Sequence, residues 1–181
     1  VVSRVTQDIA RWLADGHKAM PVAVNVSARQ CVNRNIVEVV RSALRDTGIP
    51  PSLLKLEITE TTAMTDAAQV IELLEEISAL GVRIAVDDFG TGYSSLAYLK
   101  RFPINELKID RSFVQDVATD ADDAAIVRAT IALAHELGIL VVAEGVENQA
   151  QSSFLAAQHC DIVQGFMYGV PQPLNQTTPL L

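Results

Sequence analysis

The feature that most constrains the fold of this 181-residue chain is a repeated alternation of short β-branched runs with longer amphipathic stretches. The short runs predict six strands, at residues 21–26, 53–59, 83–88, 106–109, 139–143 and 161–163. Apolar residues at helical spacing predict helices at residues 1–15, 35–47, 66–80, 94–101, 122–137 and 148–157, with Thr65 as the cap of the helix at 66–80. Strands separated by crossover helices imply a parallel sheet of the α/β class, and the near-continuous apolar run at 139–143 indicates a strand covered on both faces.

Two parallel α/β architectures are compatible with the six predicted strands. A doubly wound sheet that binds nucleotides would carry a phosphate loop after its first strand, and neither G-x-G-x-x-G nor G-x-x-x-x-G-K-[ST] occurs there. A (β/α)8 barrel needs eight strands, whereas this chain begins inside a helix and supplies six. We therefore expect residues 1–181 to be a single domain with a TIM-like barrel fold, incomplete at its N-terminal side and lacking about the first two strands.

The amino-acid composition indicates which partners the chain can bind and in which compartment it resides. With 14 basic and 22 acidic side chains the formal net charge is −8, which argues against a nucleic-acid polymer as partner. Cys31 and Cys160 lie far apart and form no metal-binding or disulfide pattern, which fits a reducing compartment. The apolar stretch 131–143 is interrupted by charge and is too short for a membrane span. We expect a cytoplasmic domain, in a parent protein that can itself be membrane-anchored.

Polar side chains stand at the C-terminal part of every predicted strand. They are Asn25, Glu57, Asp87, Asp88, Lys108, Glu144 and Gln164. A lone acid in this position is more often a helix cap than a ligand, but six successive strands with the same pattern favour a shared site, because the C-terminal strand ends of a parallel barrel meet on one face. Carboxylates so close together need a compensating cation.

The residue types indicate the chemistry of that cation. Oxygen donors without His or Cys suit hard divalent ions, so Mg²⁺ or Mn²⁺ is expected rather than zinc. The adjacent pair Asp87 and Asp88 could hold two ions at once. Paired ions about 3.5–4 Å apart are typical of in-line phosphoryl displacement, which favours phosphodiester hydrolysis. Lys108 would orient the attacking water or neutralise charge.

Six segments together resemble the EAL family of cyclic di-GMP phosphodiesterases, bacterial signalling domains that hydrolyse cyclic di-GMP to linear pGpG. These segments are residues 25–30 (NVSARQ), 57–60 (EITE), 87–95 (DDFGTGYSS), 108–110 (KID), 143–147 (AEGVE) and 164–166 (QGF). The resemblance spans essentially the whole chain. It implies a two-metal mechanism whose ligands are Asn25, Glu57, Asp87, Asp88 and Glu144, with Asp87 bridging two Mg²⁺ or Mn²⁺ ions.

The resemblance also implies roles for the remaining polar residues. Lys108 is similar to the lysine that positions the attacking water, and Glu144 to a carboxylate that serves as metal ligand or general base. Four further residues would support the site or the substrate: Glu60, Asp110, Glu147 and Gln164. Glu60 resembles the residue that holds the loop after Asp88 in place. The resemblance also implies a homodimer, with contacts through this loop and the short helix that follows it. Further sensory or signalling domains are expected in the parent chain.

Two departures from the family pattern matter. The Glu-Ala-Leu signature does not occur in these 181 residues, so we expect hydrolysis from the intact domain and none from this chain alone. Val170 stands where the family often has Arg, which would weaken a ligand or surface contact.

Two alternatives stay open at the level of the sequence. One is an inactive EAL domain that senses cyclic di-GMP or binds proteins, which loss of the carboxylates would favour. The other is an unrelated metal-carboxylate barrel, such as an enolase-type enzyme with Lys108 as base; only the family resemblance argues against it.

Overall fold

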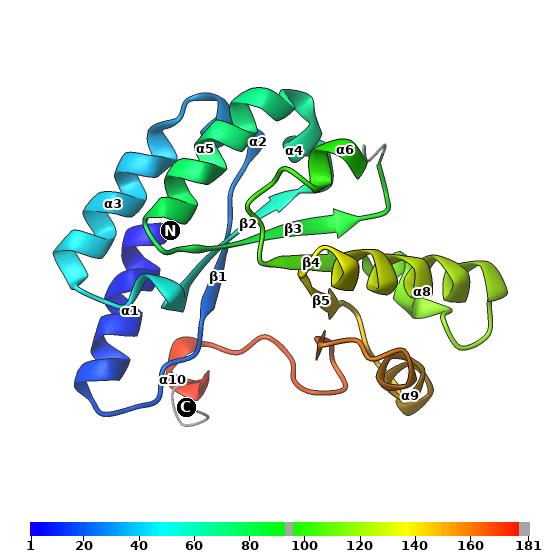
Figure 1. Ribbon diagram of the computed structural model, residues 1–181. Helices are drawn as coiled ribbons and strands as arrows, with labels where there is room; N and C mark the ends of the chain where they lie inside the picture. Colours follow the sequence, from blue (N-terminus) through cyan, green and yellow to red (C-terminus); the bar gives the residue numbers. More distant parts are fainter. Residues whose placement is uncertain (93–95, 178–181) are drawn as a thin grey trace.

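The computed structural model describes residues 1–92 and 96–177 of the chain (Figure 1). Its centre is a curved sheet of six strands in the order β1-β2-β3-β4-β5-β6, and every neighbouring pair is parallel. The strands are β1 (Val22–Asn25), β2 (Leu54–Thr59), β3 (Arg83–Phe89), β4 (Glu106–Ile109), β5 (Leu140–Ala143) and β6 (Ile162–Val163). Because each crossover advances by one strand, the chain forms half of an α/β barrel, which confirms the expected fold class.

Helices connect successive strands along the outer side of the sheet. The longer ones are α1 (Val2–Ala14), α3 (Asn35–Thr47), α5 (Ala67–Ala79), α8 (Ala121–Glu136) and α9 (Gln149–Ala157). All five match predicted segments to within a few residues. The predicted helix at 94–101 is shorter, as α6 (Leu96–Leu99), and residues 94 and 95 lie outside the described part of the chain.

Several short elements were not expected from periodicity, because each spans fewer than two helical turns. These are α2 (Ala28–Val32), the 3-10 helix η1 (Pro51–Leu53), α4 (Glu60–Thr65), α7 (Arg111–Gln115) and α10 (Leu174–Thr177). The cap of α5 also differs from the prediction. Asp66, rather than Thr65, accepts a hydrogen bond from the Gln69 N–H, because Thr65 belongs to the end of α4.

The outward-facing strand residues form the main core. Leu56, Ile84 and Leu107 lie on successive strands, are at most 1% exposed, and pack beneath the helices. A smaller cluster joins Ile9 and Trp12 of α1 to Ile49, so Trp12 is a core residue. The C-terminal segment returns from β6 to the other edge of the sheet, where Leu174 lies beside Trp12 and Val22.

The inner face of the sheet has a different character. Every second residue of each strand points toward the inside of the half-barrel. Near the centre of β2 and β4 these inward residues are charged: Lys55, Glu57, Glu106 and Lys108. The expectation that the strand at 139–143 is covered on both faces is wrong at its start, since Leu140 is 43% exposed. Six strands curve around an open interior and leave this residue uncovered.

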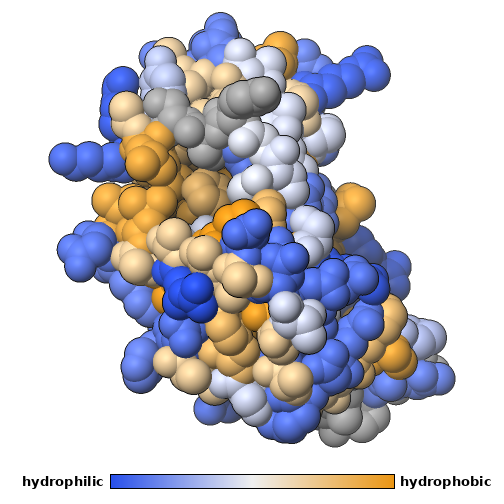
Figure 2. Space-filling model, turned by 90° about the vertical axis from the view of Figure 1, so that its right-hand side faces the viewer, coloured by the Kyte–Doolittle hydropathy of each residue, from blue (hydrophilic) through white to orange (hydrophobic). Residues whose placement is uncertain are grey.

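The outer surface mixes polar and apolar areas. Figure 2 shows one face, on which hydrophobic side chains gather in a patch bordered by hydrophilic ones. Across residues 1–92 and 96–177, no helix combines the length and the apolar character needed to cross a membrane.

The position of Leu107 predicts a large contribution to stability. It is fully buried in the middle of β4, so Leu107→Ala should lower the free energy of unfolding by about 2–5 kcal/mol through lost burial and a residual cavity. Urea denaturation would measure this change. Leu13→Ala makes the same substitution at a residue 38% exposed in α1 and serves as the control. Equal unfolding midpoints for the two variants would contradict this account of the core.

Candidate functional site

One buried ammonium group connects three strands at the C-terminal side of the sheet. Lys108 in β4 is 5% exposed, and its Nζ lies 3.1 Å from Glu57 Oε2, 3.0 Å from Asp87 Oδ1 and 2.7 Å from Glu144 Oε1. These three carboxylates come from β2, from β3 and from the residue after β5. Three predicted site residues, from β2, β3 and the segment after β5, therefore meet at Lys108 in β4.

The carboxylates around Lys108 raise its pKa. Burial alone would lower the pKa of Lys108, but the hydrogen bond to Glu144 and the surrounding carboxylates outweigh burial and raise it. Burial raises the pKa of Glu144, and Lys108 opposes that shift only in part. One ammonium cannot neutralise three carboxylates, so the site keeps an excess of negative charge.

Two consecutive aspartates reach this site because β3 is irregular. Between the pairs Val86↔Leu107 and Phe89↔Ile109, β3 uses one residue more than β4, which is a β-bulge. Asp88 lies in the bulge with φ +55°, a left-handed conformation that few residues other than glycine adopt. Its N–H donates to Asp87 Oδ1 at 3.0 Å. A regular strand would send the two side chains to opposite faces.

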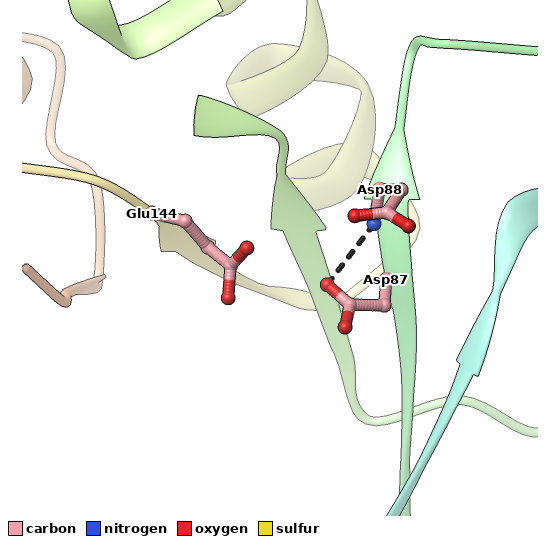
Figure 3. A group of neighbouring side chains, drawn as sticks. All are labelled: Asp87, Asp88 and Glu144. Carbon is pink, nitrogen blue, oxygen red and sulfur yellow. Dashed lines mark hydrogen bonds between the residues drawn. The ribbon is translucent and has the colours of Figure 1, made fainter. Parts of the chain in front are cut away.

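The carboxylates of Asp87, Asp88 and Glu144 form a group that suits a cation. Each offers one oxygen, and these oxygens lie within 4.8 Å of one another. Figure 3 shows Glu144, from the segment after β5, extending toward the two aspartates of β3. Burial, together with the charges of Asp87 and Asp110, raises the pKa of Asp88. The donor set contains only oxygen and fits a hard divalent cation.

Glu60 lies behind the site rather than in it. It is the first residue of α4 and is 1% exposed, and its Oε2 accepts hydrogen bonds from the N–H of Gly90 at 2.7 Å and of Gly92 at 3.4 Å. Gly90 has φ +99°, and a Cβ there would lie 2.9 Å from the Phe113 ring. Glu60 thus holds the described start of the loop after Asp88; residues 93–95 of that loop lie outside the described residues.

The other predicted residues lie around this centre. Asn25 ends β1, is exposed, and pairs in register with Glu57. The Asp110 side chain caps α7 by accepting from the Ser112 N–H at 3.0 Å. Glu147 points to Arg111, whose Nη2 lies 2.8 Å from its Oε1, and so does not join the carboxylate group.

A cavity of about 160 Å³ adjoins the site at the ends of β5 and β6. Gln164, which is exposed, lines it together with Glu144, Glu147, Arg111 and Phe166.

Sequence reasoning missed Arg111 and the ion pair of Lys55 with Glu106. The Arg111 side chain covers Gly145, where a Cβ would lie 2.3 Å from Arg111 Cγ. Lys55 and Glu106 each precede a predicted site residue by two positions. The period of two along a strand places them on the same face as Glu57 and Lys108, and this signal could have found them.

Comparison with known proteins identifies the family. The family model named "EAL domain" matches residues 1–171 of this chain. The bifunctional diguanylate cyclase/cyclic di-GMP phosphodiesterase MucR of Pseudomonas aeruginosa is 49% identical over 97% of this chain and 26% of its own length. The cyclic di-GMP phosphodiesterase NbdA of the same organism is 44% identical over 96% of this chain and 22% of its own length. The chain therefore spans about a quarter of these curated relatives.

Solved structures agree in fold. A MucR phosphodiesterase in complex with c-di-GMP superposes with a TM-score of 0.93 at 49% identity, over 99% of this chain and 72% of the other. BlrP1 of Klebsiella pneumoniae, in a complex with manganese and cyclic di-GMP, gives a TM-score of 0.81 at 29% identity, over 91% of this chain and 42% of the other. With a family match over nearly its whole length, the chain belongs to the EAL domain family.

Proposed function

We propose that the intact domain hydrolyses cyclic di-GMP to linear pGpG in a metal-dependent reaction. The observation that carries this proposal is the junction of Lys108 with Glu57, Asp87 and Glu144, next to an oxygen-only group that can hold a cation, in a chain of the EAL domain family. The relatives named as cyclic di-GMP phosphodiesterases support the choice of substrate.

The metal ligands of this proposal are oxygen donors from four adjacent segments. Asp87, Asp88 and Glu144 form the group within 4.8 Å, and Asn25 and Glu57 extend it toward the first two strands. The bulge at Asp88 brings both aspartates to the same side, and they would help to hold two Mg²⁺ or Mn²⁺ ions. Bound divalent cations would lower the pKa of a coordinated water and offset the charge of the phosphodiester.

Lys108 and Glu144 are the proposed catalytic residues. The ammonium of Lys108 holds three carboxylates in fixed positions with its three N–H donors. Metal binding to one of these carboxylates would free a donor for a water that approaches the phosphorus. Glu144 lines the cavity beside β5 and is only partly buried, so its carboxylate can accept a proton from that water. Gln164 and Glu147 line the same cavity and are proposed to contact the substrate.

Dimerisation stays a prediction. In α6, Leu96 is 57% exposed and Tyr98 is 38% exposed, and these side chains are available for contact with a second copy. Residues 93–95, which precede α6 in the proposed contact segment, lie outside the described residues.

Asp87→Asn tests the proposed function. The change removes the central charge of the metal site and keeps the shape of the side chain, so pGpG formation by the full-length protein with manganese should fall by several orders of magnitude. Chromatography of the nucleotide products would measure the rate. Asp46→Asn makes the same change at an exposed carboxylate and should leave the rate unaltered.

A variant Asp87→Asn that keeps more than about a tenth of the wild-type rate would contradict the metal assignment. A wild-type protein that binds cyclic di-GMP and never converts it would identify a sensor instead of an enzyme.

Glu60→Ala should impair catalysis without removing a ligand. Gly90 and Gly92 would lose their acceptor, and the loop that follows Asp88 would lose its support; losses of this kind cost about 10–100-fold in activity or metal affinity. Both N–H groups donate to one oxygen, which Gln retains, so Glu60→Gln should keep most of the activity. Steady-state kinetics of the two variants would distinguish these outcomes, and full activity of Glu60→Ala would refute the supporting role.

A further inference from the structure

A second buried ion pair lies beneath the site on the inner face of the sheet. Lys55 Nζ in β2 contacts Glu106 Oε2 in β4, and their side chains are 15% and 2% exposed. These strands are not neighbours, because β3 lies between them. The contact is possible because Ala85 of β3, fully buried, presents only a methyl group to the interior.

The strand register places this pair in direct relation to Lys108. Glu57 pairs with Ala85, and Ala85 pairs with Glu106, so the two glutamates flank one alanine. The Lys55 side chain reaches across β3 to Glu106, and the Lys108 side chain reaches across the same strand to Glu57. Two lysines and two glutamates thus alternate around Ala85, and each lysine bonds the glutamate of the opposite strand.

The electrostatic consequence concerns Lys108. Glu106 and Lys108 lie two residues apart on one face of β4, about 6.6 Å between Cα atoms. A buried carboxylate without a partner is strongly unfavourable, and in the interior it attracts a nearby ammonium much more strongly than in water. If Lys55 were absent, Glu106 would compete with Glu57, Asp87 and Glu144 for the ammonium of Lys108.

We infer that Lys55 is a positioning residue that neutralises Glu106 and thereby keeps Lys108 directed at Glu57, Asp87 and Glu144. The inference rests on the proposed function for its kinetic readout. It assigns to this ion pair a role in the site rather than only in the stability of the sheet.

The test uses Lys55→Met in the full-length protein, because Met is unbranched, is shorter than Lys by only one atom and carries no charge. The kcat for cyclic di-GMP hydrolysis should fall about 10–100-fold. Manganese affinity, measured by titration calorimetry, should rise on the order of 10-fold, because Lys108 would no longer compete for the carboxylates. A purely structural role for Lys55 would lower the melting temperature and would not tighten metal binding.

Removing the partner charge should reverse both effects. In Lys55→Met/Glu106→Leu and Lys55→Met/Glu106→Gln, no carboxylate remains to attract Lys108, and at least one variant should recover kcat and manganese affinity toward wild type. Arg83→Met is the matched control, since Arg83 pairs with Lys55 in register but is exposed; both quantities should stay unchanged.

The inference is overturned if Lys55→Met keeps wild-type kcat and manganese affinity, or if neither double variant recovers them. A wild-type protein that forms no pGpG would reject the proposed function alone. In that case, unaltered manganese affinity in Lys55→Met would overturn the positioning role, and tighter binding that either double variant reverses would support it.

Discussion

The arrangement of the site depends on one buried ammonium. Lys108 is the residue through which carboxylates of β2, β3 and the segment after β5 are held within hydrogen-bond distance of a common point. Without a cation, three acids in a partly buried position would repel one another and disfavour the folded state. The same excess of negative charge that the lysine cannot cancel makes the position suitable for divalent ions.

Side chains alternate between the two faces of the parallel sheet, so that one face contributes to the core and the other to the site. Outward residues such as Leu56 and Leu107 form the apolar core under the helices, whereas the inward residues near the centre of β2 and β4 carry charge. On β2 and β4 the inward charges form two ion pairs across β3, Lys55 with Glu106 and Lys108 with Glu57, around Ala85. Small inward residues such as Ala85 allow contacts across an intervening strand, so the strand register determines which charges can meet.

Much of this could be predicted from the sequence, because period-two and helical patterns mark strands and long helices directly. The six strands and the convergence of Glu57, Asp87, Lys108 and Glu144 follow from the rule that parallel strand ends share a face. The bulge at Asp88 could not be predicted, since it arises from the mismatch between β3 and β4. The partner of Glu60 was accessible only through the family resemblance, and the pairing of Lys55 with Glu106 requires the three-strand register.

The central claim is that the Lys108 ammonium organises a hydrolytic centre rather than a structural salt bridge. The most direct measurement is the rate of pGpG formation by full-length protein carrying Lys108→Met, with circular dichroism to verify the fold. We expect a folded variant whose rate is several orders of magnitude below wild type, since the carboxylates would lose their common partner and the attacking water would lose its donor. A folded Lys108→Met variant that hydrolyses cyclic di-GMP at the wild-type rate would contradict the central claim.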